Sequence, residues 1–84
     1  MIARLKGHVE ILGDNSVIVN VGGVGYLVSC SRQTIAQLSA GSEASLLVET
    51  IIRPEQMTLV GFASADEQQC FRLLILSLGI IRNF

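Results

Sequence analysis

Apolar and polar side chains alternate along the first segment of the chain. The apolar positions are Ala3, Leu5, Gly7, Val9 and Ile11, and the polar positions between them are Arg4, Lys6, His8 and Glu10. Because successive side chains of a strand point to opposite faces, this pattern predicts a half-buried β-strand with one face in water. Residues 13–15 (Gly-Asp-Asn) then favour a turn, since these residue types tolerate positive φ.

A glycine pair separates the next two apolar segments. Residues 16–21 are rich in β-branched side chains, and residues 24–30 form a second apolar run after Gly22-Gly23, so the sequence predicts a hairpin. The glycines do not predict a nucleotide site, because no helix or Lys-Ser/Thr ending follows them. Gly25 is a candidate for the close approach of another backbone.

The second half of the chain predicts a short helix and a long hairpin. Ser31 can cap a helix that runs to about residue 38. Residues 43–53 and 57–62 are strongly apolar and predict two strands. The Arg53-Pro54-Glu55-Gln56 segment between them predicts a turn, since proline fixes φ at its first corner.

A capping box opens the last element. Ser64 and Glu67 have the required spacing, and the helix that follows is expected to pack Phe71, Leu74 and Leu78 inward. Gly79 stands where a helix-ending glycine belongs, which would place Ile80 against Ile75 across the cap.

This order of elements indicates an all-β fold, a small Greek-key barrel with one short internal helix and a C-terminal helix. We divide the chain into a barrel over residues 1–63, a helix over 64–78 and a tail over 79–84. The expected core is Leu5, Val9, Val19, Val28, Leu46, Val48, Leu59 and Phe62, closed at one end by Phe71 and Leu74.

The composition of the chain argues against several classes of function. The chain has 84 residues, 50% of them hydrophobic, and a net charge of −1, which argues against a domain that grips nucleic acid by itself. Cys30 and Cys70 lie in apolar contexts and are expected to be reduced and buried; no metal or cofactor site is indicated. The chain shows no secretory signal, and its apolar runs are shorter than a membrane span, so we expect a cytoplasmic protein.

Few residues suggest chemistry. His8 lies on the wet face of the first strand without a spaced acid or nucleophile, so no catalytic set is present. Arg4 and Lys6 form a small basic strip, which is either ordinary solvated surface or a contact for a phosphate backbone. Glu55 is held at the tip of a proline-containing hairpin, where an ordinary polar turn is the simpler interpretation.

Four segments, in order along the chain, resemble the family of the N-terminal domain of RuvA, the Holliday-junction-binding subunit of a bacterial branch-migration complex. They are MIARLKG at 1–7, VGGVGY at 21–26, ETIIR with LVGF at 49–53 and 59–62, and an E-x-x-x-F-x-x-L helix at 67–74. The resemblance implies an OB-fold barrel in a homotetramer that cradles four-way junction DNA, without cofactor or catalysis, beside a RuvB-type ATPase.

The resemblance also gives Glu55 a role. The family carries two adjacent acidic residues at this turn, a pin that repels phosphates and parts the strands, whereas helix-hairpin-helix motifs in the following domain grip the phosphates. Here Pro54 replaces the first acid and Glu55 retains the second. Arg4, Lys6 and Arg53 are the candidate contacts to the DNA backbone.

A second departure leaves two functions open. The family continues with a G-V-G hairpin into its DNA-binding domain, whereas this chain has Gly79-Ile80-Ile81 and ends at Phe84. The chain is therefore either a domain excised from a longer protein or a degenerate relative. The alternative function is an interaction or oligomerisation module that has lost DNA binding.

Overall fold

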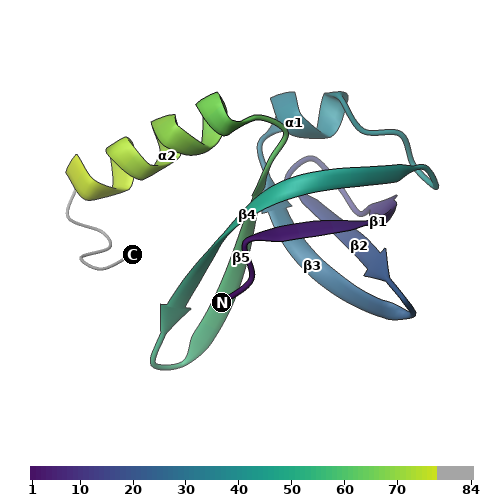
Figure 1. The fold of residues 1–84 in the computed structure, drawn as a ribbon, viewed down its shortest axis with the longest axis horizontal. Helices are drawn as coiled ribbons and strands as arrows, with labels where there is room; N and C mark the ends of the chain where they lie inside the picture. Colours follow the sequence, from purple (N-terminus) through teal and green to yellow (C-terminus); the bar gives the residue numbers. More distant parts are fainter. Residues whose placement is uncertain (78–84) are drawn as a thin grey trace.

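The computed structural model describes residues 1–77, in which five strands close into a barrel, with one short helix before the fourth strand and a longer helix after the fifth (Figure 1). The elements are β1 (Arg4–Ile11), β2 (Ser16–Val21), β3 (Val24–Cys30), α1 (Arg32–Ala36), β4 (Glu43–Arg53), β5 (Gln56–Phe62) and α2 (Ala65–Ser77). The order around the barrel is β1-β2-β3-β5-β4. The predicted all-β OB-type barrel with a short internal helix and a C-terminal helix is confirmed.

Strand β1 joins the two halves of the barrel because it pairs antiparallel with β2 at one end and with β4 at the other. Its inward residues meet inward residues of both partners, as in Val9 opposite Val19 and Leu5 opposite Leu46. A short parallel ladder between β3 and β5, from Val28–Leu59 to Cys30–Gly61, closes the barrel. The β-strand alternation predicted for residues 3–11 therefore places one face inside.

All eight residues expected in the barrel core are buried: Leu5, Val9, Val19, Val28, Leu46, Val48, Leu59 and Phe62. Val17 and Cys30 join the central cluster. Phe62 is buried in a different place. Its cross-strand partner Leu47 precedes the inward Val48, so both point to the outer face of the sheet, towards α2.

The glycine pair forms the predicted hairpin. Gly22 has φ 57° and Gly23 has φ 90°, the left-handed values that a two-residue turn of this kind requires at both positions. The Gly23 amide also donates to Asn20 Oδ1 at 3.0 Å.

A close backbone approach occurs at Gly7 and not at Gly25. A Cβ built on Gly7 would lie 2.1 Å from the Asn20 carbonyl oxygen, whereas one on Gly25 would meet only the Ile18 side chain. The expectation for Gly25 was wrong because its neighbour across the hairpin is a side chain on the same face.

Helix α2 docks with a rotation that the sequence did not predict. Ile75 is buried, but Leu74 is 60% exposed, so the expectation that Leu74 closes the core is wrong. Polar contacts of Gln68 and Arg72 with β4 turn the docked face of the helix away from Leu74. The same rotation exposes Cys70, which was expected to be buried, whereas Cys30 is buried as expected. The interpretations of Leu78, Gly79 and Ile80 lie outside the described residues.

Candidate functional site

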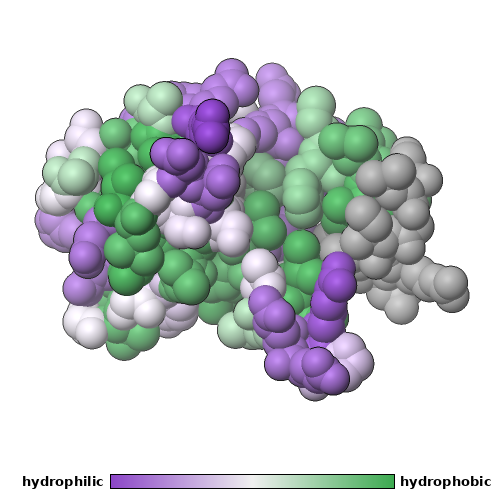
Figure 2. Space-filling model, turned by 180° about the vertical axis from the view of Figure 1, so that it is seen from behind, coloured by the Kyte–Doolittle hydropathy of each residue, from purple (hydrophilic) through white to green (hydrophobic). Residues whose placement is uncertain are grey.

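The β4–β5 hairpin projects from the barrel (Figure 1). The β3–β5 ladder stops at Leu59, so residues 51–53 and 56–58 pair only with each other in the described part of the chain. Three residue pairs at ~3.3 Å per residue place the turn about 10 Å beyond the barrel wall. In the space-filling view the tip stands off the body and is hydrophilic on the side shown (Figure 2).

Glu55 occupies the turn of this hairpin. The residues Pro54 and Glu55 form the turn between Arg53 and Gln56, which are paired, and both turn residues are exposed. Within residues 1–77 the Glu55 carboxylate accepts no hydrogen bond and joins no ion pair. The structure therefore places one free negative charge at the end of a protruding element.

One face of the hairpin is polar towards the tip. Ile51, Arg53, Gln56 and Thr58 line one hollow, and Gln56 Nε2 donates to Thr58 Oγ1 at 3.1 Å. The opposite face carries Ile52 and Met57, which continue the row of Thr50 and Leu59 from the barrel interior.

The three candidate DNA-contacting cations do not form one patch. Arg4 and Lys6 lie on the outer face of β1, opposite Leu47 and Ser45. Lys6 Nζ is 3.8 Å from the exposed Glu43 carboxylate, which partly offsets its charge. Arg53 lies six residues beyond Leu47 on β4, about 20 Å along the strand, beside Glu55.

A buried carboxylate that the sequence analysis did not single out fixes α2 to the same strand. Glu49 lies on the outer face of β4, where it is covered by α2 and only 5% exposed. It accepts hydrogen bonds from Gln68 Nε2 at 2.9 Å and from Arg72 Nε. Burial of a carboxylate is costly unless it is paired in this way. The signal for it was an acidic residue in the interior of a mostly apolar strand.

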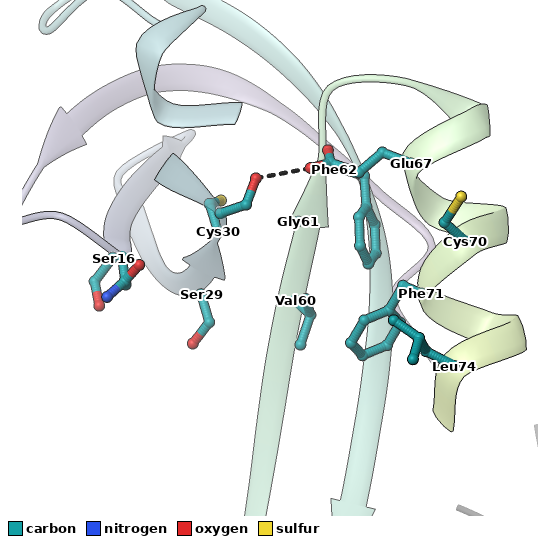
Figure 3. Close-up of a pocket in the computed structure, with 12 residues that line it drawn as sticks. Ser16, Ser29, Cys30, Val60, Gly61, Phe62, Glu67, Cys70, Phe71 and Leu74 are labelled. Carbon is teal, nitrogen blue, oxygen red and sulfur yellow. Dashed lines mark hydrogen bonds between the residues drawn. The ribbon is translucent and has the colours of Figure 1, made fainter. Parts of the chain in front are cut away.

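Glu67 ties α2 to α1 and to the end of β5. Its carboxylate accepts hydrogen bonds from Ser31 Oγ at 2.7 Å (the dashed line in Figure 3), from Thr34 Oγ1 at 2.5 Å and from the Ala63 amide at 3.3 Å. Ser64 Oγ accepts from the Glu67 amide at 3.2 Å, as the predicted capping box requires. In an ideal capping box the Glu67 carboxylate would also accept from the amide of Ser64. Here it accepts from the amide of Ala63, one residue before the cap.

These contacts predict how stability depends on pH. Burial alone would raise the pKa of Glu67, but the hydrogen bonds from Thr34, Ser31 and Ala63 outweigh it, and the pKa is lowered from its usual 4.5. A lowered carboxylate pKa stabilises the fold above the unfolded-state pKa, and this contribution is lost as pH falls through the folded-state pKa. We expect Glu67→Gln to lower the melting temperature at pH 7, with a deficit that shrinks as pH falls below about 4.5.

The control for this experiment is Asp66→Asn, which removes a neighbouring exposed carboxylate of the same helix turn. Thermal melts of the three proteins between pH 3 and pH 7 provide the comparison. A deficit of Glu67→Gln that stayed constant over this range would show that the charge of Glu67 contributes nothing.

An apolar pocket of about 480 Å³ is lined by residues of β3, β5 and α2 (Figure 3). Phe62 and Phe71 form its inner wall, with ring centroids 5.1 Å apart, and Leu74 lies at its edge. Cys30 also borders it, and burial raises the pKa of this thiol to about 11, so the thiol is protonated at neutral pH. The pocket therefore offers packing surface and no nucleophile at Cys30.

Residues 1–77 contain neither a metal-binding cluster nor a membrane-spanning helix. No group of three or more His, Cys, Asp or Glu side chains there is placed to hold a metal ion. None of the helices in that part of the chain has the length and apolar character needed to cross a membrane.

Comparison with known proteins identifies a family. A family model described as "RuvA N terminal domain" matches residues 1–61. A Paramagnetospirillum magneticum protein is 46% identical over 80 residues, covering 95% of this chain and 38% of its own length. Proteins from Sinorhizobium fredii and Xanthobacter autotrophicus are 48% and 51% identical over 75 residues, covering 88% of this chain and 37% of their own lengths. All three are named "Holliday junction branch migration complex subunit RuvA". The chain thus spans little more than a third of the length of these relatives.

Proposed function

Because this chain belongs to the RuvA N-terminal domain family, we propose that it is the assembly and strand-separating domain of a Holliday-junction-binding subunit in DNA recombination and repair. The observation that carries this proposal is the projecting β4–β5 hairpin, whose tip bears a carboxylate that has no partner among residues 1–77. The relatives' shared name, as a subunit of a branch migration complex, supports the same assignment.

In this proposal the domain positions charge and performs no catalysis. Four copies of the chain surround a four-way DNA junction, and their Pro54-Glu55 turns face one another at its centre. Each Glu55 carboxylate then repels the phosphates of the exchanging strands and helps to part them. A RuvB-type ATPase supplies the work in the cytoplasm, and no cofactor is needed.

The small number of basic residues agrees with a domain that does not itself grip the phosphates. The 84-residue chain has a net charge of −1, and Lys6 lies beside Glu43, so the chain offers little to displace counterions from DNA. The main phosphate grip then belongs to the part of the relatives that lies beyond this match, about three fifths of their length. In this proposal the chain consists of a barrel over residues 1–63, a helix over 64–78 that leads to that part, and a tail over 79–84.

A chimera tests the function. Residues 1–77 replace the matching segment of the Paramagnetospirillum relative, and affinities for four-way junction and duplex DNA are measured across a salt titration. Junction binding that prefers the junction over duplex and weakens steeply with salt is expected, with weak or no binding by the 84-residue chain alone. If the relative binds and a folded chimera does not, the domain is instead an interaction module without a role in DNA binding.

Glu55→Gln in this chimera is expected to reduce discrimination between junction and duplex DNA while folding is unchanged. Loss of one charge a few ångströms from a phosphate in a wet setting is worth ~1 kcal/mol, or about fivefold in the affinity ratio. The measurement is that ratio at one fixed, low salt concentration, since screening weakens the effect.

Glu10→Gln serves as the matched control because Glu10 is an exposed carboxylate on β1, away from the tip. It removes the same charge and should leave the ratio unchanged. An equal ratio for parent and Glu55→Gln would make Glu55 an ordinary turn residue.

A further inference from the structure

Two large apolar side chains are exposed side by side on the projecting hairpin. Ile52 is 69% exposed and Met57 is 59% exposed, and the two residues are directly opposite each other in the β4–β5 ladder. Paired residues of an antiparallel ladder point to the same face, so their side chains form one apolar surface. This surface lies one residue pair from the Pro54-Glu55 turn.

The base of this surface is anchored. Thr50 Oγ1, two residues before Ile52 on the same face, accepts a hydrogen bond from the Ile2 amide at 3.2 Å and donates to the Ile2 carbonyl oxygen at 2.8 Å. Leu59, opposite Thr50, is buried in the core. The apolar surface therefore extends the barrel interior outward along a hairpin whose root is held on this face.

The hairpin is thus amphipathic about its own axis. Arg53 and Gln56 occupy the polar face, and Ile52 and Met57 occupy the other. A strand end in water ordinarily carries polar side chains on both faces, and exposed apolar clusters on a protruding element mark contacts with another molecule. The pairing of two such side chains on a protruding element makes this face a contact surface for another molecule to cover.

We propose that Ile52 and Met57 form a wedge that packs against the faces of unstacked nucleobases at the centre of the junction. This inference rests on the proposed function, because it takes the hairpin to lie at that centre. It adds a second mode of action to the hairpin: contact with bases beside repulsion of phosphates.

The charge beside the surface selects this occupant. The Glu55 carboxylate is unpaired in the described residues and lies within one Debye length, about 10 Å at 0.1 M salt. It disfavours the approach of phosphate, so the part of a nucleic acid that can cover the apolar face is its uncharged part, the bases. Isoleucine, methionine and proline, all present at this hairpin end, are among the residue types that proteins insert between base steps.

The wedge also accounts for the turn sequence. With Pro54 before it, Glu55 is the one carboxylate in the turn, and the Arg53 and Glu55 charges sum to zero at the tip. At a distance the Arg53 charge cancels that of Glu55, so the carboxylate repels phosphate only at short range, where the apolar face also makes its contacts. In this chain strand separation therefore depends on contact with the bases as well as on charge.

The test uses Ile52→Thr and Met57→Gln, singly and together, in the chimera described above. Threonine keeps the β-branch and glutamine keeps the length of the side chain, so the hairpin is preserved while its apolar surface is lost. Leu27→Gln is the matched control, since Leu27 is 61% exposed on β3, away from the hairpin. The probe is a four-way junction with 2-aminopurine at the crossover.

We expect the parent chimera to raise 2-aminopurine fluorescence on binding, because unstacking relieves its quenching. The double variant should lose at least half of that rise and about fivefold in junction affinity, with an unchanged salt slope, because an apolar contact releases no counterions. Leu27→Gln should match the parent.

The outcomes separate the two proposals. If the parent binds and unstacks the junction and the double variant does so equally, the wedge is wrong and the proposed function stands. If the double variant changes the oligomeric mass of the chimera without DNA, the face packs against a second copy and the wedge is again overturned. If the parent chimera fails to bind any junction, the proposed function fails and the wedge fails with it.

Discussion

Gly7→Ala is expected to destabilise the barrel by about 3 kcal/mol or more, the upper range for forcing extra atoms into a packed interior. Gly7 is buried on β1, where this strand passes from β4 to β2. The new Cβ would lie 2.1 Å from the Asn20 carbonyl oxygen and 2.8 Å from its carbonyl carbon. Both atoms belong to a backbone held in two ladders, so neither can move without breaking hydrogen bonds between strands.

Gly13→Ala is the control for this prediction. No atom lies within 4 Å of a Cβ at Gly13, and its φ is not in the left-handed range. The substitution should therefore change stability by no more than about 0.5 kcal/mol. Urea unfolding of both variants gives the comparison, and similar midpoints for the two would show that β1 does not pass Asn20 this closely.

The strands were predictable because their cause is local. Alternation along residues 4–11, β-branched side chains in 16–21 and the left-handed glycines at 22 and 23 each act over a few residues, and the structure has the predicted boundaries to within a residue. The inward positions followed directly, since strand periodicity fixes which side chains share a face. The Ser31 cap was also local, although α1 ends at Ala36, before the predicted limit.

The docking of α2 was not predictable in the same way. A helical period permits several rotations, and contacts with distant segments choose among them. Here the choice depends on Glu49, which is 23 positions from Arg72 in sequence, and on Ser31 and Thr34 at Glu67. No pattern within residues 64–77 reports these partners, so Leu74 and Cys70 were assigned to the wrong side.

The candidate site also combines features that could be predicted from the sequence with features that could not. The projecting turn at Glu55 follows from the length of two strands and one proline, so its place was predictable, although its role is a proposal. The separation of Arg53 from Arg4 and Lys6 could not be predicted, because it depends on how far β4 continues beyond its pairing with β1. The Ile52–Met57 pair required the ladder register, which sets two residues on one face.

Phe62→Ala is expected to cost about 3–5 kcal/mol, a large part of the 5–15 kcal/mol by which small domains are usually stable. Phe62 is 4% exposed and meets Phe71 at 5.1 Å, tilted by 52°. It lies between the outer face of β5 and α2, so alanine would leave a cavity that joins the pocket behind it. The loss should therefore fall on the attachment of α2 as well as on the barrel.

Phe62 and Phe71 contact each other across the interface between β5 and α2. Because the two rings contact each other, Phe62→Ala and Phe71→Ala should be non-additive in a double-mutant cycle, with a coupling of about 0.5–1.5 kcal/mol. Leu73→Ala, at a position 56% exposed on α2, is the control and should show small effects and no coupling to Phe62. Urea unfolding of the five variants measures each free energy of unfolding. A Phe62→Ala protein that unfolds cooperatively at nearly the parent midpoint would mean that Phe62 does not hold α2 against the barrel.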